Sequence, residues 1–367
     1  MPRWIKKSFV ALFALFYALV FCELFTRFFD PQPLMPRYVT GSPSGIRMNI
    51  PGSNYHQHTP EVDVDIRIND QGFRADKNYS LKPAEGTCRI AIFGDSIFMG
   101  YEVDIHDSYA SQLEEQLKKY GTSAEVINFS VSGFGTAENI INLEKNAIPF
   151  SPHIVLFEWH QSDFKDNIRS KLFKLKNGSL IPDAKSYLPA ISTRDYLMKF
   201  AAYRWLIENS QFYSAIREKT AENVKKVLVW ARSLNSLRLN SAHADTNNKS
   251  SKNDESDGDY EKELSLALLN DANTISHQHN MEFMVVDIPK RISRVEYISP
   301  LSWFGSYSSQ FKFDFISPLN RFLRIGSPDT MLYYEKGQGH LTPLGNKILA
   351  EETAKHLFEK HYLNNCK

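Results

Sequence analysis

The sequence has little cysteine and almost no net charge. Its three cysteines, Cys22, Cys88 and Cys366, are too few and too scattered along 367 residues for a disulfide framework. A formal net charge of +1 gives no sign of a nucleic-acid or other polyanionic partner. No internal repeat is present. At 42% hydrophobic residues, the chain can bury one sizeable core.

Metal-ligand patterns are also scarce. His56 and His58 stand in a polar stretch without a carboxylate at helical spacing, so exposure to solvent is the favoured interpretation. Each cysteine has an ordinary explanation: an apolar segment for Cys22, the start of a buried strand for Cys88 and the tail for Cys366. We therefore expect no metal site, no cofactor and no redox function.

The N-terminus has a long apolar run. Residues 9–22 are uninterrupted by charge, and Arg3, Lys6 and Lys7 precede them. With its flanks this run is just long enough to span a bilayer, and the leading positive charges place its start in the cytoplasm. We predict a single-pass inner (plasma) membrane protein whose main domain lies in the periplasm or otherwise outside the cytoplasm. A signal peptide cleaved near Cys22 is the rival interpretation.

Apolar runs that end in small polar clusters predict buried strands. Residues 89–93 lead into Gly94-Asp95-Ser96, residues 126–131 into Ser132-Gly133, and residues 153–159 into a His-Gln-Ser-Asp sequence at 160–163. Residues 281–287 add a fourth strand. In a parallel sheet these clusters meet at one crevice outside the carboxyl ends of the strands. The prediction is an α/β fold: a three-layer α/β/α domain with a mostly parallel sheet, plus the N-terminal transmembrane helix.

A last motif lies near the C-terminus. Gly339-His340-Leu341 leads into a predicted helix, with Thr342 as its N-cap and Pro343 at its first position. The helix would leave His340 in a loop that can reach the crevice.

The three polar clusters after the strands and the Gly-His motif near the C-terminus form four blocks. In this order they resemble the SGNH (GDSL-type) hydrolase superfamily, from about Arg89 to Leu363 with one large interruption. The Asn-x-x-Gly-Phe-Arg stretch of residues 69–74 also resembles membrane-anchored bacterial members. The resemblance implies that Ser96 is the nucleophile, that His340 is the general base and that Gly133 gives a backbone N–H to the oxyanion hole.

The chemistry explains these residue types. A serine hydroxyl attacks an ester only when a base takes its proton, and imidazole suits that role near neutral pH. The resulting oxyanion needs donors already in place, and the backbone N–H groups of Ser96 and Gly133 are the candidates.

Two positions depart from the family pattern. Ser162 precedes Asp163 where the family has an asparagine, so Ser162 or Gln161 supplies the third oxyanion donor, or the donor is missing. Gly337 stands where the family has the aspartate that orients the histidine. Glu335 is the nearest upstream carboxylate and the expected substitute, and a backbone carbonyl is the alternative.

Further residues at the crevice are candidates for substrate binding. His160, Asp163 and Trp159 stand at or beside the end of the third predicted strand. A histidine or an aromatic ring at such a place is also typical of a hydrogen-bonded wall or of the core.

The predicted organisation is an anchor at 1–30, a juxtamembrane spacer with one short strand at 31–80, and the hydrolase-like domain at 81–367. An insertion occupies about 165–260. It contains a helical pattern at 194–234, which fits a cap over the crevice or core packing, and a polar loop at 237–259.

The expected function is a serine esterase acting on O-acyl or O-acetyl groups of an envelope or exported polysaccharide. The expected binding partners are the ester-bearing substrate and, through the N-terminal helix, the membrane. Acyl transfer through the same acyl-serine intermediate is a second hypothesis, and a non-catalytic glycan-binding protein of the same fold is a third, motivated by Ser162 and Gly337.

Overall fold

The structure is a computed structural model and describes residues 2–32, 34, 38–217, 219–220, 253–336 and 339–366. The chain forms two compact units. Unit 1 combines Met1–Arg37, Gln57–Pro60 and Tyr196–Lys252, and unit 2 combines Tyr38–His56, Glu61–Asp195 and Asn253–Lys367. Each unit is described by itself.

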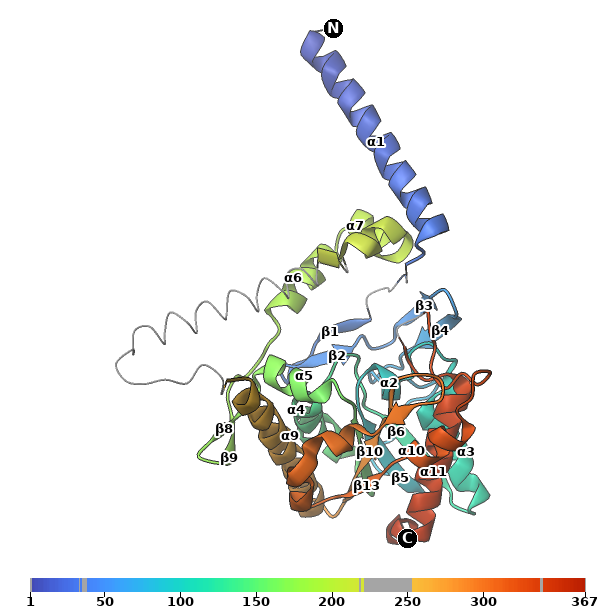
Figure 1. The fold of residues 1–367 in the computed structure, drawn as a ribbon, viewed down its shortest axis with the longest axis vertical. Helices are drawn as coiled ribbons and strands as arrows, with labels where there is room; N and C mark the ends of the chain where they lie inside the picture. The colour runs from blue at the N-terminus through green and yellow to red at the C-terminus, as the bar shows by residue number, and fades with distance from the viewer. Residues whose placement is uncertain are drawn as a thin grey trace, which may run out of the picture. The chain divides into compact units, whose positions relative to one another are not determined.

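The core of unit 2 is a sheet of five parallel strands (Figure 1). Ile90, in the second strand from one edge, lies opposite Val126 on one side and Ile154 on the other. In spatial order the strands are β13 (Asp314–Ile316), β10 (Glu282–Asp287), β7 (Ile154–Trp159), β5 (Cys88–Phe93) and β6 (Ala124–Asn128).

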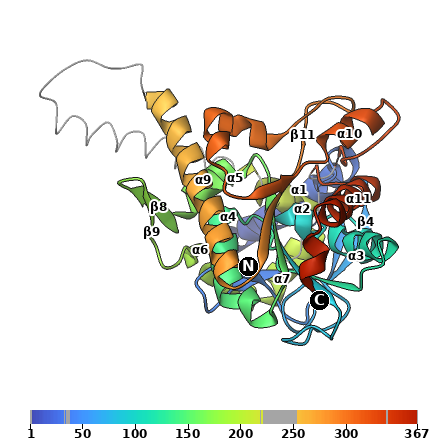
Figure 2. The same cartoon turned by 90° about the horizontal axis from the view of Figure 1, so that it is seen from below.

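Both faces of this sheet are covered by helices (Figure 2). Successive side chains of a strand point to opposite faces, so Ile90 and Ile92 of β5 join one apolar cluster while Ala91 and Phe93 join the other. Such strands read as continuous apolar runs because both of their faces are buried. The predicted three-layer α/β/α fold is confirmed.

The helices divide between the two faces. The first cluster includes side chains of α4 (Thr136–Asn142), α5 (Asp163–Ser170) and α9 (Asn253–Gln278). The second includes side chains of α2 (Ser96–Met99), α3 (Tyr109–Lys119), α10 (Leu319–Ile325) and α11 (Pro343–Glu359). Short helical turns are η1 (Ile105–Asp107), η2 (Leu143–Ala147), η3 (Ile148–Phe150), η4 (Pro300–Gln310) and η5 (Tyr362–Cys366).

Short antiparallel pairs surround this core. They are β1 (Val39–Gly41) with β2 (Arg47–Asn49), β3 (Asn54–His58) with β4 (Asp63–Arg67), β8 (Phe173–Lys176) with β9 (Ser179–Pro182), and β11 (Lys290–Arg291) with β12 (Tyr297–Ile298). Residues 38–56 and 61–80, expected as a spacer, therefore fold within unit 2. His56 lies on β3, not in a loop, and its ring bonds Asp65 at 3.0 Å.

The predicted strands occur with boundaries that differ by at most three residues, and β4 matches the short strand expected before residue 80. The strand β13 was not predicted, because it has only three residues and exposes Phe315. The helical pattern at 194–234 begins as α6 (Pro189–Leu197) and α7 (Ala201–Asn209), which a turn at 198–200 separates. Residues 221–252, with most of the expected polar loop, lie outside the described residues.

Unit 1 contains α1 (Arg3–Phe29). Its span Trp4–Phe29 has 26 residues and a mean hydropathy of 2.2, and among the described residues it is the one helix long and apolar enough to cross a membrane. At 1.5 Å per residue it is about 39 Å long, against about 30 Å for the hydrocarbon layer of a bilayer.

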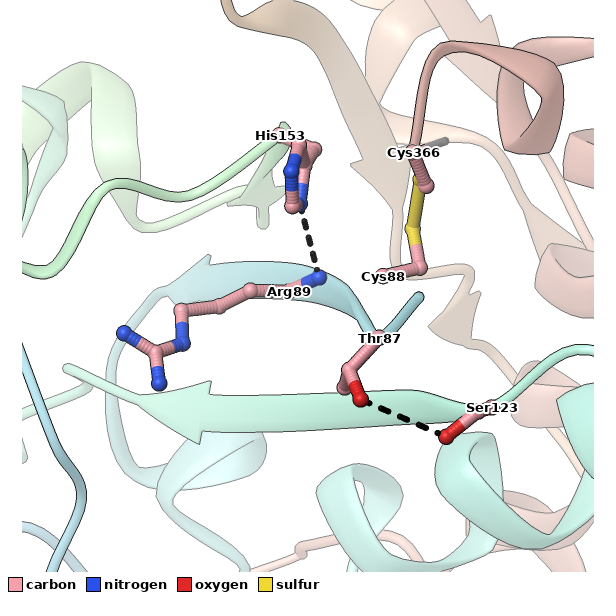
Figure 3. Close-up of a disulfide and its surroundings, with 6 residues drawn as sticks. All are labelled: Thr87, Cys88, Arg89, Ser123, His153 and Cys366. Atoms are coloured by element: carbon pink, nitrogen blue, oxygen red, sulfur yellow. Dashed lines mark hydrogen bonds between the residues drawn. A yellow bond between two sulfur atoms is a disulfide. The ribbon is translucent and has the colours of Figure 1, made fainter. Parts of the chain in front are cut away.

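A disulfide joins Cys88 to Cys366, although the cysteines were judged too few and too scattered for a disulfide framework (Figure 3). Sequence spacing could not reveal the pair, because 278 residues separate its members. The pairing follows from the fold: η5 comes after α11, and Leu357, Leu363 and Cys366 share an apolar cluster with Cys88 at the start of β5. The C-terminus is thereby tied to β5, the strand that precedes Ser96.

Removing this bond is expected to lower the stability of unit 2. Replacing Cys366 by serine should reduce the free energy of unfolding by about 2–5 kcal/mol, since a crosslink across a long loop restricts the unfolded chain. Thermal melts with and without dithiothreitol measure the effect, and reductant should bring the wild type to the level of Cys366→Ser. Equal melting temperatures without reductant would contradict the pairing.

Candidate active site

The site begins at the turn after β5. Gly94 passes so close to β7 that a Cβ there would lie 2.0 Å from the Glu158 carboxylate. Asp95 then caps α2, and its carboxylate accepts the Ile97 N–H at 2.8 Å. The turn leaves Ser96 at the first position of α2, at the carboxyl end of the sheet, where a parallel sheet binds its ligands.

Glu158, on the neighbouring strand β7, stabilises this turn. One of its carboxylate oxygens accepts the N–H groups of Asp95 at 3.0 Å and of Phe98 at 3.1 Å. Burial raises the pKa of Glu158 well above its ordinary value, and the neighbouring Asp95 and Asp163 raise it further. Glu158 is a structural support of the turn at Ser96 that the sequence patterns did not identify.

His340 reaches Ser96 from the other end of the chain. Its Nε2 lies 2.8 Å from the Ser96 hydroxyl oxygen, although 244 residues separate them. Backbone pairing fixes the loop, since the Tyr334 N–H donates to the His340 carbonyl at 2.9 Å. Thr342 caps α11 and Pro343 starts it, as the sequence predicts.

The acid beside His340 is Glu102. Its Oε2 lies 2.7 Å from His340 Nδ1, and the side chain of Glu102 is completely buried. Glu102 has a left-handed backbone with φ of 62°, a conformation costly for a residue with a Cβ. Strain of this kind persists where the surroundings hold it, and here it directs the carboxylate to the imidazole.

This geometry corrects the expectation for Glu335. The Glu335 carboxylate is bound by Arg294, with both N–O distances at 2.7 Å, and it is not at His340. That ion pair lowers the pKa of Glu335 and holds its carboxylate outside the site. Gly337, the position of the family's aspartate, lies outside the described residues.

Arg74 holds the loop that carries Glu102. Its buried guanidinium donates to the carbonyls of Met99 at 3.1 Å and of Val103 at 2.5 Å, and also to that of Gly100. Burial lowers the pKa of Arg74 to about 10, so the group stays charged at neutral pH. Both flanks of Glu102 are therefore bound to one cation.

The Asn-x-x-Gly-Phe-Arg stretch acquires a physical role from these contacts. The Asn69 side-chain oxygen accepts the N–H groups of Gln71 at 3.0 Å and of Phe73 at 2.9 Å, which closes a local turn. Gly72 has φ of 87° in this turn. The turn sends Phe73 into the core against Phe129 and Arg74 to the loop of the acid.

Gly133 lies in the loop after β6 with φ of 74°, which only glycine adopts without strain. Its carbonyl accepts from the Arg47 guanidinium and, at 3.4 Å, from Arg169. Arg47 comes from β2, within the stretch expected as a spacer, and its Nε also donates to the Tyr187 hydroxyl at 3.2 Å. Two cations thus hold the backbone of the proposed oxyanion donor.

The residues after β7 divide into two groups. His160 is half-buried, and its Nδ1 lies 3.0 Å from the Ser162 hydroxyl oxygen. Burial lowers the pKa of His160, and the neighbouring His340 lowers it further while Asp95 opposes this. Asp163 and Trp159 instead belong to the interior: the Asp163 carboxylate accepts the His160 N–H at 2.7 Å, and Trp159 is fully buried. Both side chains are buried and support the loop from the interior. Neither lies at the surface, where it was expected to contact substrate.

One cluster among the described residues has the composition of a metal site. Ligand atoms of Cys88, His153 and Cys366 lie within 4.8 Å of one another. The two sulfurs are joined in the disulfide and so carry no thiolate charge, and His153 Nδ1 accepts the Arg89 N–H at 3.0 Å (Figure 3). This cluster is at the opposite end of β5 from Ser96.

Comparisons with known proteins find a similarity to one esterase over a short part of the chain. No family model matches the chain. An arylesterase of Vibrio mimicus is 32% identical over 75 residues, a stretch that is 20% of this chain and 38% of that protein.

Several solved structures are also similar. They include a GDSL-like lipase from Bacteroides thetaiotaomicron (9% identity, 76% of this chain and 91% of that chain, TM-score 0.36). An acetyl xylan esterase (12%, 73% and 99%, 0.37) and the esterase EstA from Pseudoalteromonas (14%, 74% and 98%, 0.37) are two more.

The two candidate acids can be separated by matched substitutions. Glu102→Gln keeps the size of the side chain and removes the charge that holds His340, so kcat should fall about 10²–10⁴-fold with little change in KM. Glu335→Gln, the same change at the carboxylate bound by Arg294, should leave kcat within about twofold. Initial rates on a chromogenic acetyl ester measure both variants, with thermal melts to check folding. A loss confined to Glu335→Gln would reverse the assignment.

Proposed function

We propose that this chain is a serine esterase of the SGNH (GDSL) type, with Ser96 as nucleophile, His340 as general base and Glu102 as the acid that orients it. The observation that carries the proposal is the continuous hydrogen-bonded chain from the Ser96 hydroxyl through His340 to the Glu102 carboxylate. The similarity to an arylesterase over 75 residues agrees with ester hydrolysis.

The reaction follows from these contacts. His340 Nε2 takes the proton of the Ser96 hydroxyl while its oxygen attacks the ester carbonyl carbon. The buried Glu102 carboxylate stabilises the imidazolium that forms. His340 then gives the proton to the departing alkoxide, which leaves an acyl-Ser96. Attack by water on this intermediate, with His340 again as base, releases the acid and restores the serine.

The negative oxygen of the tetrahedral intermediate needs donors that are already oriented. We assign this role to the backbone N–H groups of Ser96 and Gly133, with the hydroxyl of Ser162 as a further donor in place of the family's asparagine. The bonds from Arg47 and Arg169 to the Gly133 carbonyl support this assignment, because they hold the backbone of the donor in place. One oxyanion donor contributes about 3 kcal/mol to catalysis.

For substrate and place we propose acyl groups, such as acetate, on an envelope or exported polysaccharide, reached from a single-pass anchor in the inner membrane. The apolar span of α1 supports the anchor. The Cys88–Cys366 disulfide supports a domain outside the cytoplasm, because disulfides persist in oxidising compartments. The choice of polysaccharide is an analogy with the family.

The alternative functions differ from hydrolysis in their products. Acyl transfer would use the same acyl-Ser96, and adding a sugar acceptor to the assay would convert the acceptor to its ester. The non-catalytic hypothesis was motivated by Ser162 and Gly337. The carboxylate of Glu102 beside His340 argues against the part of it that rests on Gly337.

The nucleophile is tested by Ser96→Ala. Hydrolysis of a panel of chromogenic acyl esters by the full chain should fall about a thousandfold or more, because one member of a catalytic unit is removed. Thermal stability should stay close to wild type. Ser309→Ala, at an exposed serine of η4, is the matched control and should keep full activity. Wild-type turnover in Ser96→Ala would refute the assignment.

Topology is tested by a reporter that is active only outside the cytoplasm, fused after Lys367. The fusion should be active and should stay with the membranes after a high-salt wash. Recovery in a soluble periplasmic fraction would indicate cleavage near Cys22. A cytoplasmic signal would contradict both the anchor and the cleaved form.

A further inference from the structure

Unit 1 contains a segment with an exceptional amount of exposed apolar surface, residues 196–216, which we call the aromatic segment. Trp205 is 60% exposed and Phe200 51%. The other large exposed apolar side chains of this segment are Tyr196, Leu206 and Ile216. Single exposed side chains are ordinary, but five within 21 residues mark a surface that contacts something other than water.

The aromatic segment is bound to the transmembrane candidate α1. The Glu23 carboxylate, in the second half of α1, accepts the Ser210 hydroxyl at 2.7 Å and the N–H groups of Gln211 at 3.0 Å and Phe212 at 3.1 Å. Glu23 thus occupies the start of the helical stretch that begins at Gln211 and satisfies its free N–H groups. Arg27, one turn further along α1, donates to the Asn209 carbonyl at 2.5 Å.

These bonds fix where the aromatic segment meets α1. Glu23 precedes the end of α1 at Phe29 by six residues, which is about 9 Å along the axis. Because α1 is about 9 Å longer than the hydrocarbon layer, its last turns reach the headgroup region on the far side. A charged pair such as Glu23 with Arg27, at 2.7 Å, fits that boundary better than the bilayer centre.

The composition of the aromatic segment agrees with this depth. Tryptophan and tyrosine are enriched at membrane interfaces, where one end of the ring is apolar and the other is wet. Lys199 lies over the Tyr196 ring at 5.8 Å, and Arg204 donates to the Met198 carbonyl at 2.7 Å, so cations stand among the exposed rings. Interfacial helices that bind anionic lipids combine these residue types.

We propose that the aromatic segment is a second membrane attachment, which lies in the headgroup layer of the bilayer that α1 spans and is held there by Glu23 and Arg27. The proposal rests on the membrane anchor proposed above and does not depend on the esterase activity. Its occupant is the lipid surface, and neither a second copy of the chain nor a peptide is needed to cover the exposed rings.

The test measures the depth of two labelled positions in the full chain. Cys22 is the one free cysteine among the described residues, and it lies in α1. A fluorescent label on Cys22 reports insertion of α1. In a Cys22→Ser background, the same label on Trp205→Cys reports the aromatic segment. Both proteins are reconstituted in vesicles of three parts phosphatidylcholine to one part phosphatidylglycerol, with phospholipids that carry a quencher at a shallow or a deep position.

At position 205 the shallow quencher should act at least twofold more strongly than the deep one. Leu81→Cys in the same background is the matched control, since Leu81 is also an exposed apolar residue but lies in unit 2, and its label should not be quenched. Glu23→Ala should reduce quenching at position 205 at least twofold, whereas Glu208→Ala, at an exposed glutamate of α7, should not.

The outcomes separate the two proposals. Quenching at Cys22 without quenching at position 205 keeps the anchor and overturns the interfacial attachment. The absence of quenching at both positions overturns the anchor itself. Protection of position 205 that appears only at high protein-to-lipid ratio would assign the surface to a second copy of the chain and would also overturn the proposal.

Discussion

The hydrogen bonds from buried Arg74 to the loop around Glu102 are the constraint on which the site depends. Glu102 must keep a left-handed backbone to reach His340. Because the residue has a Cβ, this conformation has a conformational cost that glycine would not have. The guanidinium binds carbonyls on both sides of Glu102, at Met99 and Val103, and so holds the conformation. Because Glu102 in turn holds His340, the orientation of the imidazole toward Ser96 depends on a cation that bonds to neither His340 nor Ser96.

The same logic extends to the other parts of the site. Glu158 supports the turn of Ser96, and Arg47 supports the loop of Gly133. These supports come from β7 and β2, whereas the groups they position follow β5 and β6. The geometry of the candidate site is therefore a property of the assembled domain. Residues 38–80, which resemble a spacer in composition, supply two of the cations that maintain it.

The sequence predicted what local patterns encode. Four strands of the sheet were recognisable because both of their faces are buried, and Ser96 and His340 stood in motifs next to secondary structure. Glu102 was missed because its partner is 238 residues away, and a search for the acid upstream of His340 found Glu335 instead. A signal was nonetheless present: Glu102 is a single carboxylate within an apolar run six residues after the nucleophile, and such residues are rarely buried without a partner. The disulfide and β13 escaped for related reasons, since one is a contact over 278 residues and the other is only three residues long.

The two units differ in the kind of interaction that holds their functional segments. In unit 2, the buried charged groups around the site are held by hydrogen bonds to neighbouring groups, as those of Arg74, Glu102 and Glu158 show. In unit 1, apolar side chains remain exposed, and the polar groups of Glu23 and Arg27 are used to hold one helical segment to another. For the proposed membrane-anchored esterase, attachment at two points would restrict how the anchor rotates and would place no demand on Ser96, His340 or Glu102.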